Sequence, residues 1–102
     1  MGCVMAVYDF KGDSQELAKR YDDVLRKVAS VSSGRPMIHV AVPREYGFMV
    51  VDVWSDEAAL AAFQKNEEFQ RVLREGGLPE PTLRTYPIHN FGWPIDEVPM
   101  YR

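Results

Sequence analysis

The sequence predicts one α+β domain in which two helices pack against a four-stranded antiparallel sheet. Three observations predict this fold. The chain has 102 residues, the length of one ordinary domain. Hydrophobic residues make up 46% of it, which suits a globular core. Four segments rich in β-branched and aromatic residues are separated by turn residues and by two segments of helical periodicity.

The first strand and the first helix are predicted at the start of the chain. Residues 3–10 are rich in Val, Met, Tyr and Phe and stop at Lys11-Gly12-Asp13, which predicts a strand and a turn. Asp13 and Glu16 have the spacing of a capping box, which marks a helix start. Apolar residues then recur at helical spacing: Leu17, Tyr21, Val24, Leu25 and Val28. We expect this helix to end between residues 30 and 34.

Two apolar runs, residues 36–42 and 46–54, predict an antiparallel hairpin around Pro43-Arg44-Glu45. Both runs are apolar on both faces. This is unusual, because one face of an antiparallel sheet normally meets water and carries polar residues. A chain this short also buries only about two-thirds of the surface of its unfolded form. We therefore expect helices to cover one face of the sheet and a second subunit to cover the other.

The second helix is predicted to follow Ser55, which is a good N-cap residue. Asn66 marks either a kink or a break into two shorter helices, and Gly76-Gly77 ends the helical segment. Residues 82–89 alternate and predict the fourth strand. We expect residues 1–89 to form the domain and residues 90–102 to form an arm packed on the domain or on a partner subunit.

The predicted order of elements, βαββαβ, is that of the ferredoxin-like fold. Within it, five features of the sequence resemble the third strand and second helix of the dimeric α/β-barrel superfamily: Asp52-Val53-Trp54-Ser55, Glu57-Ala58, Leu60, Phe63 and Phe69. The resemblance is greatest to the antibiotic biosynthesis monooxygenase branch. It implies a homodimer whose two sheets close a barrel, with a pocket between the sheet and the helices of each subunit. Members of the superfamily include cofactor-free oxygenases, cyclases and isomerases, so the fold leaves the reaction open.

Several classes of function are disfavoured by the composition. The net charge of −3 and the mixed charges leave no basic patch for nucleic acid. No apolar run approaches the roughly 18 to 20 residues that span a bilayer, so we expect a cytoplasmic protein without a membrane partner. The single Cys3 and the two histidines show no metal-ligand spacing, and we expect no metal.

We also expect no cofactor. The chain has neither a phosphate-binding loop nor a dinucleotide fingerprint. The haem-degrading branch of the superfamily carries a tryptophan and, later, an iron-binding histidine in its second helix. Phe63 and Leu73 stand at those places here.

His39, Asp52 and Tyr86 are the candidate catalytic residues. An imidazole in the middle of a strand can act as a general base or acid near neutral pH, although it can equally be a hydrogen-bonded core or interface histidine. Asp52 lies between two valines and is either a proton acceptor or half of a structural ion pair with Arg84. The Tyr86 phenol can stabilise a developing oxyanion.

Four aromatic residues are the candidate ligand contacts: Tyr8, Phe48, Trp54 and Phe63. The two-residue period places Phe48 and Trp54 on the same strand face as Asp52, where flat molecules can stack beside a carboxylate. The alternative is that these side chains only fill the core. Five tyrosines and five phenylalanines in so short a chain favour an aromatic-lined space.

Two functions fit these residues. The first is a cofactor-independent monooxygenase, cyclase or isomerase that acts on a small aromatic or polyketide-like molecule. The second is a non-catalytic homodimeric module that binds a small apolar ligand or serves as a scaffold.

Overall fold

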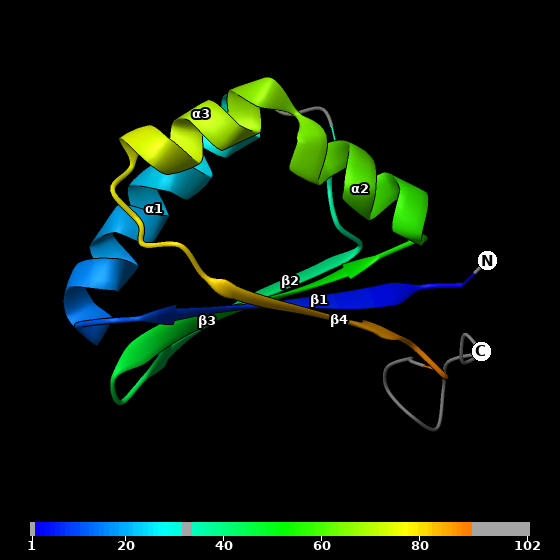
Figure 1. The fold of residues 1–102 in the computed structure, drawn as a ribbon, viewed down its shortest axis with the longest axis horizontal. Coiled ribbons are helices and arrows are strands. Elements are labelled where there is room, and N and C mark those ends of the chain that lie inside the picture. Colours follow the sequence, from blue (N-terminus) through cyan, green and yellow to red (C-terminus); the bar gives the residue numbers. More distant parts are fainter. Residues whose placement is uncertain (1, 32–33, 91–102) are drawn as a thin grey trace.

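The computed structural model describes residues 2–31 and 34–90, and it has the predicted order of strands and helices (Figure 1). The elements are β1 (Val4–Lys11), α1 (Ser14–Val31), β2 (Ile38–Arg44), β3 (Gly47–Trp54), α2 (Glu57–Lys65), α3 (Glu67–Glu75) and β4 (Thr82–Pro87). The strands form one antiparallel sheet in the order β2-β3-β1-β4. The predicted ferredoxin-like α+β fold is confirmed.

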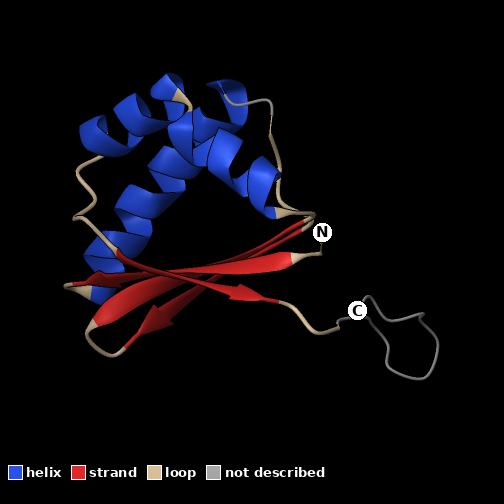
Figure 2. Ribbon diagram, turned by 45° about the vertical axis from the view of Figure 1, so that its right-hand side comes forward, coloured by secondary structure: helices blue, strands red, loops and turns tan. Residues whose placement is uncertain are grey.

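The molecule has two layers, because all three helices lie over the same face of the sheet (Figures 1 and 2). Alternate residues of the two central strands, β1 and β3, form the core between the layers. The buried core residues of these strands include Val4, Ala6, Phe10, Phe48, Val50 and Trp54. Helix α1 contributes the buried Leu17, Tyr21 and Val24, as its apolar spacing predicts. One end of α1 is capped by Asp13, whose carboxylate accepts the Glu16 backbone N–H at 2.9 Å.

The second helical segment differs from the prediction at its start. The prediction of Ser55 as the N-cap is wrong: Asp56 caps α2, and its carboxylate accepts the Ala59 backbone N–H at 2.8 Å. Both residue types are good caps, but a carboxylate also interacts favourably with the positive end of the helix dipole.

Asn66 separates α2 from α3. Of the two predicted alternatives, a kink or a break into two helices, the break is therefore correct. Its backbone is extended, and its N–H donates to Phe63 O at the end of α2. Its side-chain oxygen accepts the Phe69 backbone N–H at 3.0 Å and so begins α3. One residue thus ends the first helix and caps the second, and the two helices take different directions over the sheet (Figure 1).

The sheet face away from the helices also carries a cluster of apolar residues. The apolar residues that alternate with the core positions on β1, β2 and β3 are Met5, Val7, Ile38, Val40, Val42, Met49, Val51 and Val53. We call these eight residues the open face. No helix covers it in the part of the chain that the structure describes (Figure 2). Val40 is 46% exposed. The predicted arm falls almost entirely outside the described residues, since only Asn90 belongs to them.

Candidate functional site

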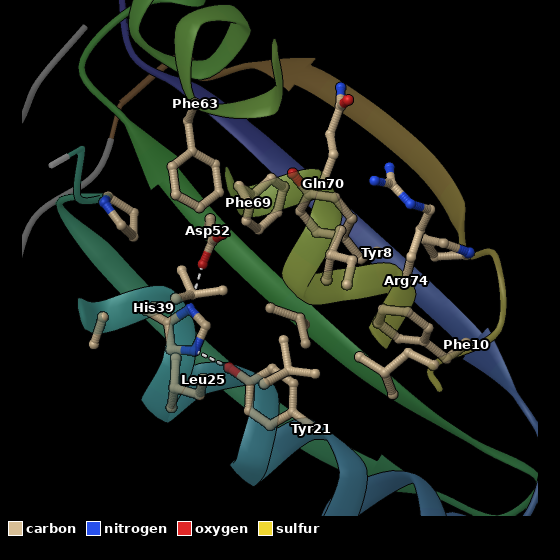
Figure 3. Close-up of a pocket in the computed structure, with 18 of the residues that line it drawn as sticks. Tyr8, Phe10, Tyr21, Leu25, His39, Asp52, Phe63, Phe69, Gln70 and Arg74 are labelled. Carbon is tan, nitrogen blue, oxygen red and sulfur yellow. Dashed lines mark hydrogen bonds and ion pairs between the residues drawn. The ribbon is translucent and has the colours of Figure 1, made fainter. Parts of the chain in front are cut away.

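A cavity of about 700 Å³ lies between the sheet and the helices. Its lining comes from β1, β2 and β3 of the sheet, from α1, α2 and α3, and from the loops before β2 and β4 (Figure 3). Most of the lining is apolar, including Phe10, Val24, Val28, Val50, Phe63, Phe69 and Leu73. This volume lies within the range of about 300 to 1,000 Å³ of small-molecule sites.

Three polar side chains form a hydrogen-bonded chain along one wall of the cavity (Figure 3). Tyr21 comes from α1, His39 from β2 and Asp52 from β3. His39 Nδ1 lies 2.5 Å from Asp52 Oδ1, and the Tyr21 hydroxyl is hydrogen-bonded to His39 Nε2. The strand register sets the first contact, because His39 and Asp52 are direct partners in the β2–β3 pair.

The order of donors in this chain follows from chemistry. A carboxylate only accepts hydrogen bonds, so His39 Nδ1 carries a proton and donates it to Asp52. In the neutral imidazole Nε2 then has a free lone pair, which accepts the hydroxyl proton of Tyr21. Asp52 therefore selects the tautomer that makes Nε2 the basic atom.

The surroundings of the site raise the pKa values of both His39 and Tyr21. The hydrogen bond to Asp52 raises the pKa of His39, against the opposing effect of burial. Burial raises the pKa of Tyr21 far above that of a free phenol, and the negative charge of Asp52 adds to this. The Tyr21 hydroxyl thus keeps its proton at neutral pH, while His39 is able to take one up.

A second phenol lines the cavity from the central strand β1. The Tyr8 hydroxyl accepts a hydrogen bond of 3.2 Å from the Gln64 amide, which leaves its own proton available to a ligand. Burial raises the pKa of Tyr8, so this group is also a neutral donor. Phe63 and Phe69 flank the α2–α3 break with ring centroids 4.2 Å apart and form an aromatic wall.

The structure brings together some of the predicted site residues and separates others. His39, Asp52, Tyr8 and Phe63 all line the cavity. Phe48 and Trp54 are buried behind it: Phe48 packs on Tyr21 with centroids 5.0 Å apart, and Trp54 packs on Phe63 at 4.9 Å. They therefore support the lining residues.

Tyr86 does not join this group. It pairs with Met5, whereas Asp52 and Thr85 both pair with Ala6, so Tyr86 lies on the opposite face of the sheet. It is 44% exposed. The ion pair of Asp52 with Arg84 is a wrong prediction for the same reason, since Arg84 pairs with Val7 on that face. The partner of Asp52 is His39.

Tyr21 is the site residue that the sequence analysis missed. Its position in the apolar stripe of α1 indicated a core residue, and its ring is indeed buried at 8% exposure. The signal that distinguishes it is the hydroxyl, because a buried phenol needs a hydrogen-bond partner. On a helix that packs on a sheet, that partner must come from the sheet.

Within residues 2–31 and 34–90, no group of three or more His, Cys, Asp and Glu residues is placed to hold a metal ion. Over the same ranges, no helix combines the length and the apolar character needed to cross a membrane.

The fold and the cavity define a ferredoxin-like α+β protein with a candidate ligand site between its sheet and its helices. No protein-family model matches the chain, and no curated protein is significantly similar to it in sequence. Solved structures, however, share its fold. The resemblance in fold to the antibiotic biosynthesis monooxygenase branch is confirmed by them.

Three of these structures illustrate the likeness. SnoaB, a cofactor-independent oxygenase from Streptomyces nogalater, is 14% identical over 92% of this chain and 99% of its own, with a TM-score of 0.69. A Caulobacter crescentus protein provisionally named an antibiotic biosynthesis monooxygenase is 16% identical over 85% and 90%, with a TM-score of 0.65. A conserved Methanosarcina mazei protein is 11% identical over 85% and 93%, with a TM-score of 0.67. Likeness at these identities establishes a shared fold and no shared activity.

Proposed function

We propose that the chain is a cofactor-independent enzyme that binds a small aromatic or polyketide-like molecule in the cavity and removes a proton from it. The observation that carries this proposal is the Tyr21–His39–Asp52 chain on the wall of a largely apolar cavity of about 700 Å³. General base catalysis requires a base that is held in the correct tautomer beside the bound ligand.

The proton path begins at Tyr21. In the resting state the Tyr21 hydroxyl donates its hydrogen bond to His39 Nε2, so the lone pairs of its oxygen are available to an acidic O–H or C–H of the ligand. The ligand proton moves to the Tyr21 oxygen as the tyrosine proton moves to Nε2. The products are an imidazolium and a ligand enolate or phenolate. Asp52 stabilises the imidazolium, and the raised pKa of His39 gives this transfer a favourable direction.

Tyr8 complements this base. Its hydroxyl proton is not used by Gln64, which donates to it, so it can donate to the oxygen on which negative charge develops. The aromatic wall of Phe63 and Phe69 suits a flat ring system between the two phenols. Cyclisation and isomerisation need only such proton transfers.

Oxygenation needs molecular oxygen as a second substrate. A CH₂ group beside a carbonyl, once deprotonated, can reduce O₂; the carbon gains one oxygen atom as a new carbonyl, and the other leaves as water. The carbanion supplies the electrons, so no bound cofactor is required. The fold shared with SnoaB, a cofactor-independent oxygenase, supports this branch of the proposal.

The test uses polycyclic phenols and aryl ketones that carry an acidic CH₂ group. Exchange of that hydrogen in D₂O without oxygen measures proton removal alone, and oxygen uptake in air measures the complete oxygenation. His39→Asn should lower both by about 100-fold, the smaller end of the usual contribution of a general base. His89→Asn, at the other histidine, is the matched control and should change neither. If His39→Asn exchanged the ligand hydrogen at the wild-type rate, His39 would have no part in the mechanism.

We further propose that two copies of the chain pair through the open face. Apolar strands covered by helices on one side only leave a hydrophobic surface that a second sheet can bury. In this homodimer each subunit contributes residues 1–89 as its domain, and residues 90–102 form an arm that packs on the domain or on the partner subunit. The cytoplasmic location also remains a proposal, supported by the composition.

The alternative function is a non-catalytic dimeric module that binds a ligand or acts as a scaffold. One observation favours it: His39 and Asp52 are both already bonded within the protein. Under this alternative the cavity still binds an aromatic ligand, but the ligand neither exchanges its acidic hydrogen faster in the presence of the protein nor consumes oxygen.

A further inference from the structure

The cavity carries one charged group that the proposed reaction does not use. Arg74 lies in the last turn of α3, and its side chain lines the cavity. The other arginine at the cavity, Arg35, donates to the backbone carbonyls of Gly34 and Ala29. For Arg74, by contrast, the described residues provide no hydrogen-bond or ion-pair partner for the guanidinium.

The neighbouring arginine of the same helix shows that α3 can satisfy a guanidinium when it faces outward. Arg71 pairs with Glu68 and Glu75, one turn to either side. Arg74 is exposed as well, but it lines the cavity and has no such acidic partner among the described residues. An arginine is always charged and presents a planar fork of donors, which fits a carboxylate with two parallel hydrogen bonds.

A second donor accompanies Arg74. Gln70 is one helical turn earlier, so the two residues are neighbours on the same face of α3, and both line the cavity. The Gln70 amide nitrogen donates one hydrogen bond of 3.0 Å to Gln64 O, which fixes its position and leaves its second N–H free for a ligand. In Figure 3 both side chains extend from α3 on the side of the cavity away from His39.

The charges around the cavity leave this position open to an anion. The carboxylate of Asp52 is already hydrogen-bonded to His39 at 2.5 Å. Glu80, in the loop before β4, is the other carboxylate of the lining, and it forms no ion pair with Arg74. Much of the remaining lining is apolar and aromatic, and it includes Phe63 and Phe69.

We propose that the ligand is an aromatic acid, whose carboxylate binds Arg74 and Gln70 while its ring system lies against Phe63 and Phe69. This inference rests on the proposed function and adds the class of its ligand. The carboxylate orients the molecule, so the ionisable group at the far end of the rings meets Tyr21 and His39. Arg74 is thereby a specificity-determining residue, and it touches no reacting atom.

Two fluorescent probes with the same ring skeleton test the charge preference. Anilinonaphthalene sulfonate carries an anionic group, and N-phenyl-1-naphthylamine is the same molecule without it. Arg74→Gln should weaken binding of the sulfonate about five-fold, the size expected of a partly exposed charged pair, and leave binding of the neutral probe unchanged. Added salt should weaken sulfonate binding to the wild type more than to Arg74→Gln.

Arg71→Gln is the matched control, because it removes the same charge from the same helix at a position already paired with two glutamates. It should change the affinity of neither probe. Glu80→Gln removes the competing carboxylate and should tighten sulfonate binding. Equal loss of both probes in Arg74→Gln, or an unchanged affinity for the sulfonate, would overturn the inference.

A cavity-filling variant separates failure of this inference from failure of the proposed function. Val28 is a half-buried residue of α1 that lines the cavity, and Val28→Trp should lower the affinity for both probes. If Val28→Trp affects neither, the probes do not enter the cavity, and the ligand site itself is refuted together with the role of Arg74. If Val28→Trp affects both while Arg74→Gln affects neither, only the preference for an acid is refuted.

Discussion

His39 and Asp52 face each other across the β2–β3 pair, with Nδ1 and Oδ1 2.5 Å apart. The contact joins a side chain that is 33% exposed to one that is only 8% exposed. The edge strand thus supplies the more exposed imidazole, and the central strand supplies the buried carboxylate.

Stability should therefore depend on the protonation of His39. The pKa of His39 is raised in the folded protein above the ordinary 6.5, mainly by the hydrogen bond to Asp52. A raised pKa gives a stabilisation that is fully present below about pH 6.5 and is lost as the pH rises through the folded pKa. We expect the free energy of unfolding to fall over that window in the wild type and to lose this dependence in Asp52→Asn.

Urea denaturation at a series of pH values measures this effect, and NMR titration of the His39 ring measures the pKa directly. The His89→Asn variant assigns the two histidine ring signals. A His39 pKa that is the same in the wild type and in Asp52→Asn would contradict the proposed role of the carboxylate.

Tyr21→Phe should separate catalysis from packing. The ring keeps its contact with Phe48, so the loss of one hydrogen bond should cost only about 0.5 to 1.5 kcal/mol of stability. Proton removal from the ligand should fall about 100-fold, because the relay oxygen is gone. The exchange assay in D₂O checks the second effect and thermal unfolding the first. Tyr46→Phe, at a tyrosine that is 80% exposed, is the control that should alter neither.

Val40→Glu should convert the proposed dimer into a monomer. Val40 belongs to the open face, where a second sheet would bury the new carboxylate without a partner, at a cost of several kcal/mol. Sedimentation velocity at micromolar concentration distinguishes the two states. Gln15→Glu adds the same charge at an exposed position of α1 and should leave the dimer intact. A wild-type chain that sediments as a monomer would disprove the pairing.

Asn66→Ala should loosen the break between α2 and α3. It removes the side-chain bond to the Phe69 backbone N–H, which should cost about 1 kcal/mol of stability. Phe63 and Phe69 lie on either side of this cap, so binding of the neutral naphthylamine probe should weaken as well. Asn66→Asp keeps an acceptor at the cap and should restore both properties. Unchanged probe affinity in Asn66→Ala would show that the break does not shape the aromatic wall.

The fold could be predicted from the sequence because its signals are local. The periodicity of α1 and the valine-rich runs of β2 and β3 each identify an element without knowledge of its neighbours. The break at Asn66 is also local, since a good capping residue interrupts a segment of helix-forming residues.

The site was harder to predict because it depends on register. A hairpin that turns over residues 43–45 pairs His39 with Met49. The structure turns over Glu45 and Tyr46 instead, and this shifts the partner of His39 by three residues, from Met49 to Asp52. A small change in the turn therefore decides whether the imidazole meets a thioether or a carboxylate. Tyr21 enters from a helix, and only the packing of α1 on the sheet places its hydroxyl beside His39.

The double role of Asn66 has a consequence for how such a chain could acquire new ligands. Each residue added to or removed from α2 before the cap would turn the start of α3 by about 100° around the helix axis. The direction of α3 sets where Phe69, Gln70 and Arg74 enter the cavity, while the sheet and its proton relay stay where they are. Under the proposed function, ligand choice and proton chemistry thus depend on separate parts of the chain, and a single insertion in the helical layer would redirect the first without disturbing the second.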